Sequence, residues 1–124
     1  MMMFRSALAA TLGLSLIGPA SAQPTTQTIV VWSYGFSPVP LHFAAGRPVT
    51  LVFENRSGTS HDFKAARFFA NSTITAGAAP EGEIDLPPHA TRSITLVPHA
   101  GRYGAHCSHF FHKQLGMNDQ ILVD

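Results

Sequence analysis

Near the C terminus, a cysteine, a histidine and a methionine follow one another at five-residue intervals, as Cys107, His112 and Met117. They lie between a run of strand-forming residues over 101–107 and another over 120–123. Thiolate, imidazole and thioether groups are soft or borderline metal ligands. If these three residues bind one metal ion, the strand over 101–107 ends beside that ion and the strand over 120–123 begins close to it.

Cys107 is the only cysteine of the chain, and Met117 is the only methionine outside the first three residues. A lone cysteine in an exported protein is a free thiol, an intermolecular bridge or a metal ligand. Taken alone, a buried thiol and a methionine that fills the core are the ordinary interpretations. Their spacing with His112 favours a metal centre, because two histidines, a cysteine and a weak axial methionine form the electron-transfer copper site.

The N terminus has the three parts of a secretory signal peptide. A weakly basic start that includes Arg5 precedes an apolar run over 7–17, and small residues at 20–22 provide a cleavage motif of the A-x-A kind. The apolar run is shorter than the roughly 20 residues that cross a bilayer. We expect residues 1–22 to be a signal peptide, and residues 23–124 to be one domain in the periplasm or otherwise exported.

Charge and length limit what the exported part can do. Cleavage would leave 102 of the 124 residues, with seven basic and seven acidic side chains. This length suits one domain with one core. A neutral chain argues against nucleic acid and against an anionic membrane surface as partners. We predict a monomer with no membrane insertion after signal cleavage.

The exported part is patterned as short strands separated by glycine and proline. Strand-forming or alternating residues occupy 28–33, 48–54, 91–97, 101–107 and 120–123. This pattern predicts an all-β sandwich or barrel. The stretch over 64–82 differs, because 65–70 fits one or two helical turns and 71–82 is small and polar. We predict a short helical or irregular excursion there.

The second histidine of such a site must come from upstream of the loop. Neighbouring strands usually run antiparallel. The strand over 91–97 therefore leads away from the Cys107 end, and its length of roughly 20 Å keeps His99 from the metal. If the strand over 48–54 runs toward the Cys107 end, the loop that follows it delivers His61 to the metal.

His109 competes with His112 to be the histidine of the loop. It lies only two residues after Cys107, whereas five steps allow the chain to turn back over the metal. We therefore favour His112. Three further histidines either face outward by strand alternation or lie in a turn near the metal end: His42, His106 and His89.

The whole exported chain resembles the plastocyanin-like cupredoxins of bacteria. The residues that carry the resemblance are Phe36-Ser37-Pro38, Leu41, Phe43 and Ala45-Gly46; Asn55 with His61-Asp62-Phe63; Pro88, Ile94 and Leu96; Ala100-Gly101-Arg102-Tyr103; and the C-x4-H-x4-M loop. The resemblance implies a Greek-key β-sandwich with one copper ion. By position, it places the four ligands at His61, Cys107, His112 and Met117.

This chain departs from that family pattern at two places. Phe110 and Phe111 stand where such loops often have Pro-Gly, and Asp62 stands where many have asparagine. Asp62 either supports the Cys107 loop as a hydrogen-bond acceptor or is a solvated charge. Aromatic residues elsewhere are expected in the core: Trp32, Tyr34, Phe36, Phe53 and Tyr103.

The donor set predicts an exported one-electron carrier, not an enzyme, whose partner is a redox protein. A rigid site that suits both Cu(I) and Cu(II) lowers the structural cost of electron transfer. His112 would be the electron port, within an exposed apolar patch. The alternative is a periplasmic copper-binding protein for copper tolerance or delivery, in which the extra histidines form an exchangeable site. A third interpretation is a domain of a copper oxidase or reductase.

Overall fold

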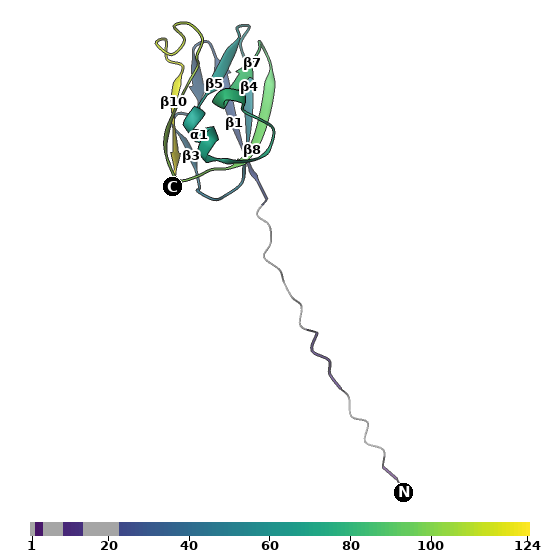
Figure 1. The fold of residues 1–124 in the computed structure, drawn as a ribbon. Helices are drawn as coiled ribbons and strands as arrows, with labels where there is room; N and C mark the ends of the chain where they lie inside the picture. Colours follow the sequence, from purple (N-terminus) through teal and green to yellow (C-terminus); the bar gives the residue numbers. More distant parts are fainter. Residues whose placement is uncertain (1, 4–8, 14–22) are drawn as a thin grey trace.

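Two five-stranded sheets face each other in the computed structural model, which describes residues 2–3, 9–13 and 23–124 (Figure 1). The first sheet has the order β2-β1-β4-β8-β6. Its strands are β1 (Thr25–Trp32), β2 (Gly35–Ser37), β4 (Val49–Asn55), β6 (Thr73–Ala76) and β8 (Thr91–Val97). The predicted signal peptide lies largely outside the described residues and stays a prediction.

The second sheet has the order β3-β10-β9-β5-β7 and contains most of the segments predicted to bind the metal. Its strands are β3 (Leu41–Phe43), β5 (His61–Lys64), β7 (Glu83–Leu86), β9 (Gly101–His106) and β10 (Asn118–Val123). The predicted all-β sandwich is confirmed. Within the described part of the chain, no helix is long and apolar enough to cross a membrane.

Strand alternation places the core between the sheets. In β4, Val49, Leu51 and Phe53 are buried, with partly exposed residues between them. In β5, Phe63 is fully buried, and its ring lies 4.9 Å from Phe53 and 5.4 Å from Phe36, measured between centroids. These contacts fix β5, the strand that begins at the first predicted ligand.

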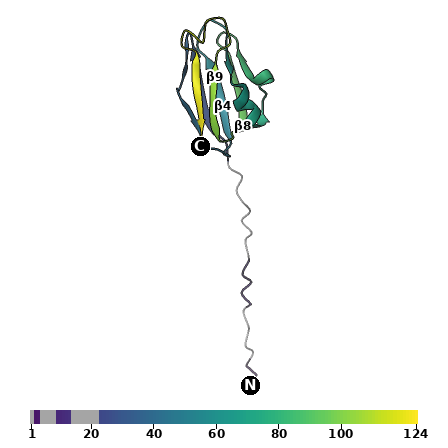
Figure 2. The same ribbon diagram turned by 60° about the vertical axis from the view of Figure 1, so that its left-hand side comes forward.

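The excursion between β5 and β8 is partly helical, as predicted, and lies at one side of the sandwich (Figure 2). It contains the helix α1 (Ala66–Asn71) and the 3-10 turn η1 (Pro80–Gly82). Two phenylalanines of α1, Phe68 and Phe69, are buried and anchor the helix to the core. The strand β6 was not predicted, because its four exposed residues pair only with β8 at the edge of the sheet.

Two of the five aromatic residues predicted to be core are not buried. Phe36, Phe53 and Tyr103 are buried, but the side chains of Trp32 and Tyr34 are 40% and 42% exposed. Burial of Val31 turns Trp32 to the outer face, where its ring covers Gly35. A Cβ at Gly35 would come within 2.6 Å of the indole, so this close contact requires glycine.

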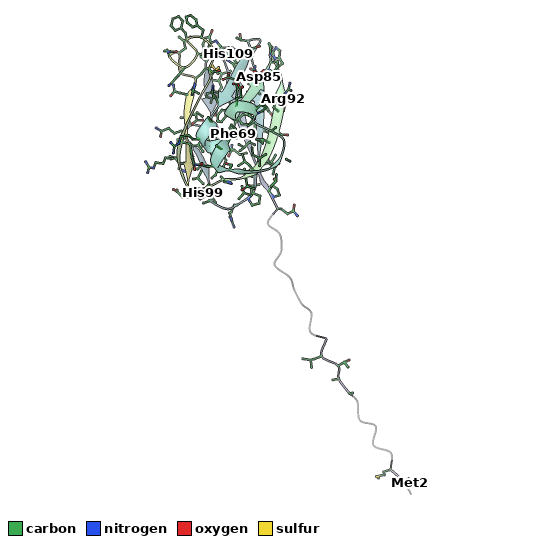
Figure 3. All side chains as sticks on the ribbon, viewed as in Figure 1. Met2, Phe69, Asp85, Arg92, His99 and His109 are labelled. Atoms are coloured by element: carbon green, nitrogen blue, oxygen red, sulfur yellow. The ribbon has the colours of Figure 1, made fainter. Side chains whose placement is uncertain are left out.

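The strand directions bring three segments to one end of the sandwich. The strand β9 runs antiparallel to both β5 and β10: its last residue, His106, pairs with Asn118 at the start of β10 and with Lys64 at the end of β5. Because β5 runs in the opposite direction to β9, its first residue, His61, lies beyond the end of β9. His109 lies at this end and His99 lies at the opposite end (Figure 3). At that opposite end, the hydroxyl of Tyr103 donates to the carbonyl of His99. The exclusion of His99 from the metal end is therefore confirmed.

Candidate metal centre

Three potential metal donors converge at this end of the sandwich. The Nδ1 atoms of His61 and His112 lie 3.1 Å apart, and the Sγ atom of Cys107 lies 3.4 Å from His112 Nδ1 and 4.0 Å from His61 Nδ1. Donors bound to one ion at roughly 2.0–2.3 Å lie about 3–4 Å from one another. The spacing therefore fits one transition-metal ion, and the donor types fit copper.

His61 is held by its neighbours with one ring nitrogen free for a metal. It begins β5 and is fully buried. Its Nε2 lies 3.0 Å from the hydroxyl of Ser33, which leaves Nδ1 facing Cys107 and His112. Burial, followed by the charges of His112 and His109, lowers the pKa of His61 to about 4. At neutral pH the imidazole is therefore neutral, the form that binds metals.

The loop that leads to His61 is fixed by a buried asparagine at the end of β4. The side-chain amide of Asn55 donates to the carbonyls of Thr59 and Leu86, at 2.9 and 3.0 Å. Its Oδ1 atom accepts the backbone N–H of Ser57. These hydrogen bonds tie the 55–60 loop to the second sheet, so the approach of His61 to the site is rigid.

Backbone hydrogen bonds fold the C-terminal loop back on itself. The N–H of Cys107 donates to the carbonyl of Met117 at 3.0 Å, and the N–H of Met117 donates to the carbonyl of His112 at 3.0 Å. The N–H of His112 in turn donates to the carbonyl of His109 at 3.1 Å. Met117 is fully buried and adjoins Cys107 through this backbone pairing.

The environment of the Cys107 thiol favours its neutral form when no metal is bound. Burial raises the pKa of Cys107, and backbone hydrogen bonds from Asp62 and His109 lower it to a smaller degree. A metal ion would stabilise the thiolate and release the proton.

The remaining histidines lie outside the donor cluster. The ring of His109 lies flat along that of His112, with centroids 5.5 Å apart and planes 14° apart, and its Nε2 lies 3.8 Å from a carboxylate oxygen of Asp62. His42 and His89 are exposed and His106 is partly exposed. The cluster found among the described residues consists of His61, Cys107 and His112.

Two residues of the centre were missed by the sequence analysis. Ser33 is the hydrogen-bond partner of His61, and the ring of Tyr34 lies 4.9 Å from the His112 ring and 6.2 Å from the His61 ring. Both residues lie in the turn between β1 and β2. This turn is distant from the ligands in the sequence, so only the tertiary arrangement reveals the contact.

A buried carboxylate lies two residues beyond Met117. Asp119 is 5% exposed, and its Oδ2 atom has no hydrogen-bond partner within the described part of the chain. Burial raises the pKa of Asp119 from 3.8 to about 6, although the Gln120 N–H opposes the shift. Because the folded pKa exceeds the unfolded one, the folded state binds the proton more tightly. Stability is therefore lost as the pH rises from about 4 to about 6.

We expect Asp119→Asn to remove this pH dependence in the metal-free protein. From pH 4 to pH 7.5, ionisation of Asp119 should lower the free energy of unfolding of the wild type by about 2–3 kcal/mol. The variant should not show this loss. Urea unfolding at both pH values measures the difference. The exposed residue Asp85 provides the control Asp85→Asn. Equal pH dependence in wild type and Asp119→Asn would show that this carboxyl titrates normally.

Comparisons with known proteins place these observations in context. The sequence matches the family model described as the cupredoxin-like domain over residues 4–118. No curated protein sequence matches the chain. The structure is similar to auracyanin A, a "blue" copper protein from Chloroflexus aurantiacus, with 19% identity and a TM-score of 0.60. That alignment covers 82% of this chain and 100% of auracyanin A.

Two further solved structures are similar to the chain. For a reduced auracyanin from Roseiflexus castenholzii, the identity is 18% and the TM-score 0.60, with 84% of this chain and 99% of that chain covered. For a multicopper oxidase from Campylobacter jejuni, the identity is 13% and the TM-score 0.63, with 86% of this chain but 31% of the oxidase covered. At these identities the similarity establishes the fold alone.

Proposed function

The chain belongs to the cupredoxin-like domain family, and from this premise we propose that it is a mononuclear copper protein that carries single electrons. The observation that carries the proposal is the approach of His61 Nδ1, Cys107 Sγ and His112 Nδ1 to within 3.1–4.0 Å of one another. Two imidazoles and a thiolate are the principal donors of a type 1 copper site.

Four residues would hold the copper ion. His61, Cys107 and His112 would bind the ion through two imidazole nitrogens and a thiolate, and Met117 would add a weakly binding thioether. Bound copper supplies one-electron chemistry by alternating between the +1 and +2 states. The protein contributes rigidity, because the ligands are buried or partly buried and joined by hydrogen bonds to strands of the core.

The apolar surface around His112 supports electron transfer to a partner protein. Phe110 is 83% exposed, and Phe111 and Leu115 are 58% and 57% exposed. Tyr34 continues this surface beside the partly exposed His112 ring. Exposed apolar patches of this kind suit weak and transient contacts. We propose an exported monomer that exchanges electrons with a redox partner through this surface.

A titration with Cu(II), followed by visible absorption, tests the proposal. We expect an intense band from thiolate-to-copper charge transfer that grows linearly and stops at one equivalent. The absence of such a band, or saturation well beyond one equivalent, would reject the mononuclear copper site. Because the site does not need a partner protein to form, the purified chain is sufficient for this experiment.

We expect Met117→Leu to keep the visible band and to raise the reduction potential. A weak axial thioether contributes little to holding copper, yet its lone pair favours Cu(II) over Cu(I). Leucine has similar volume, so the buried position should stay filled. Potentiometric titration of both proteins measures the shift. Complete loss of copper binding in the variant would mean that Met117 is not a weak axial ligand.

A second candidate function is copper tolerance or delivery, and one observation favours it. His109 is 36% exposed in its side chain and stacks directly on His112. It therefore offers a nitrogen donor beside the centre, where an exchangeable copper ion would enter or leave. The two functions make opposite demands on copper retention and on the rate of electron exchange.

A further inference from the structure

Asp62 is a buried carboxylate on the face of β5 that points away from the core. Its neighbours in sequence, His61 and Phe63, face inward, so alternation turns Asp62 to the outer face of the sheet. Nevertheless it is only 1% exposed. Its partner directly across the β5–β7 pairing, Asp85, is exposed as this face predicts. Some other part of the chain must therefore cover Asp62 and satisfy its charge.

The residue that donates hydrogen bonds to Asp62 is the one that follows Cys107. The backbone N–H of Ser108 donates to Asp62 Oδ1 at 2.6 Å, and the Ser108 hydroxyl donates to Asp62 Oδ2. Both carboxylate oxygens are therefore occupied by one residue of the metal-binding loop. Since Asp62 is joined covalently to His61 and Ser108 to Cys107, these two hydrogen bonds connect two predicted ligands.

Asp62 also lies near His109, and the ring of His109 stacks on the third predicted ligand, His112. The Nε2 atom of His109 lies 3.8 Å from Asp62 Oδ2, and the His109 ring lies flat along His112. The His109 imidazole is thus a neighbour of both the carboxylate and the ligand ring. One buried carboxylate is connected in this way to all three residues of the donor cluster.

We propose that Asp62 is a positioning residue of the metal centre, which holds the Cys107 loop through Ser108 and lowers the reduction potential through its negative charge. The inference rests on the proposed function for the identity of the metal. An asparagine would present one carbonyl oxygen to the two Ser108 donors, whereas a carboxylate accepts both. The carboxylate also places a negative charge near the metal, which favours Cu(II) over Cu(I).

The influence of this charge extends to a neighbouring side chain. Burial raises the pKa of Glu83 on β7, and the negative charges of Asp62 and Asp85 raise it further. The charge contribution to this shift agrees with a negative potential on this side of the sheet, to which Asp62 contributes. Because the copper site would lie on the other side of the same short strand, it would experience this potential too.

The metal-free protein tests the positioning function. In Asp62→Ala, we expect the amide hydrogen of Ser108 to exchange with solvent at least tenfold faster than in the wild type. The amide of Ile94, in the core of the other sheet, should exchange as before. The control Asp85→Ala removes the opposite carboxylate and should leave both amides within twofold. Equal acceleration at Ser108 and Ile94 would show global destabilisation and would overturn the positioning function.

The copper-loaded protein tests the charge. Asp62→Asn keeps the shape of the side chain and should shift the Cu(I)-to-Cu(II) ratio about tenfold toward Cu(I), which is about 59 mV for one electron. Asp85→Asn should change that ratio by less than twofold. Equal shifts in the two variants would overturn the proposed effect of Asp62 on the potential. If the wild type bound no copper, the proposed function would fail, whereas the amide exchange would still report on Asp62.

Discussion

Replacing Cys107 with serine abolishes the intense visible absorption that we expect of the copper-loaded protein. The band requires charge transfer from a thiolate to copper, and a hydroxyl group at neutral pH provides no such donor. The Sγ atom faces the Nδ1 atoms of both histidines, and Cys107 is the only cysteine of the chain. No other residue can supply a thiolate. Absorption spectra of both proteins with one equivalent of Cu(II) measure the effect.

The fold of this variant can be checked without copper. Serine is slightly smaller than cysteine, so the metal-free Cys107→Ser protein should unfold cooperatively, as the wild type does. An intense band that persists in a folded Cys107→Ser protein would mean that the colour arises elsewhere and that the assigned thiolate is wrong.

The second large effect separates the two histidines of the loop. His112→Ala should destroy the coloured site, whereas His109→Ala should leave its spectrum nearly intact. His112 Nδ1 lies 3.4 Å from Cys107 Sγ and 3.1 Å from His61 Nδ1, but His109 directs Nε2 toward Asp62. The two variants remove the same side chain three positions apart, so each serves as the control for the other.

Copper titrations of both variants, followed by absorption, give the answer. Bleaching of the His109→Ala protein together with an intact band in His112→Ala would reverse the assignment of the loop ligand.

The sequence predicted the parts of the centre that depend on ligand chemistry and on strand direction. Three donors on one loop were recognisable from their types and spacing, and the antiparallel order of strands excluded His99. The structure brings His61, Cys107 and His112 together and buries Met117 beside Cys107. Their binding of copper, like the signal peptide over 1–22, stays a prediction.

The missed features depend on contacts between segments that are distant in the sequence. Nothing local to Ser33 or Tyr34 indicates that their turn covers the two histidines. Tyr34 was assigned to the core by residue type alone, although its turn lies at the metal end. For Asp62 the sequence allows either a support of the loop or a solvated charge, because strand alternation cannot tell what covers the outer face of β5.

Electron self-exchange in the presence of a competing Cu(I) chelator tests whether the protein carries electrons. A mixture of the Cu(I) and Cu(II) forms is followed by nuclear magnetic resonance. A carrier keeps its copper through many cycles, and the buried, hydrogen-bonded ligands favour such retention. We predict that copper stays bound and that fast exchange merges the signals of the two forms. Loss of copper to the chelator within seconds, together with separate signals for the two forms, would contradict the carrier and favour copper delivery.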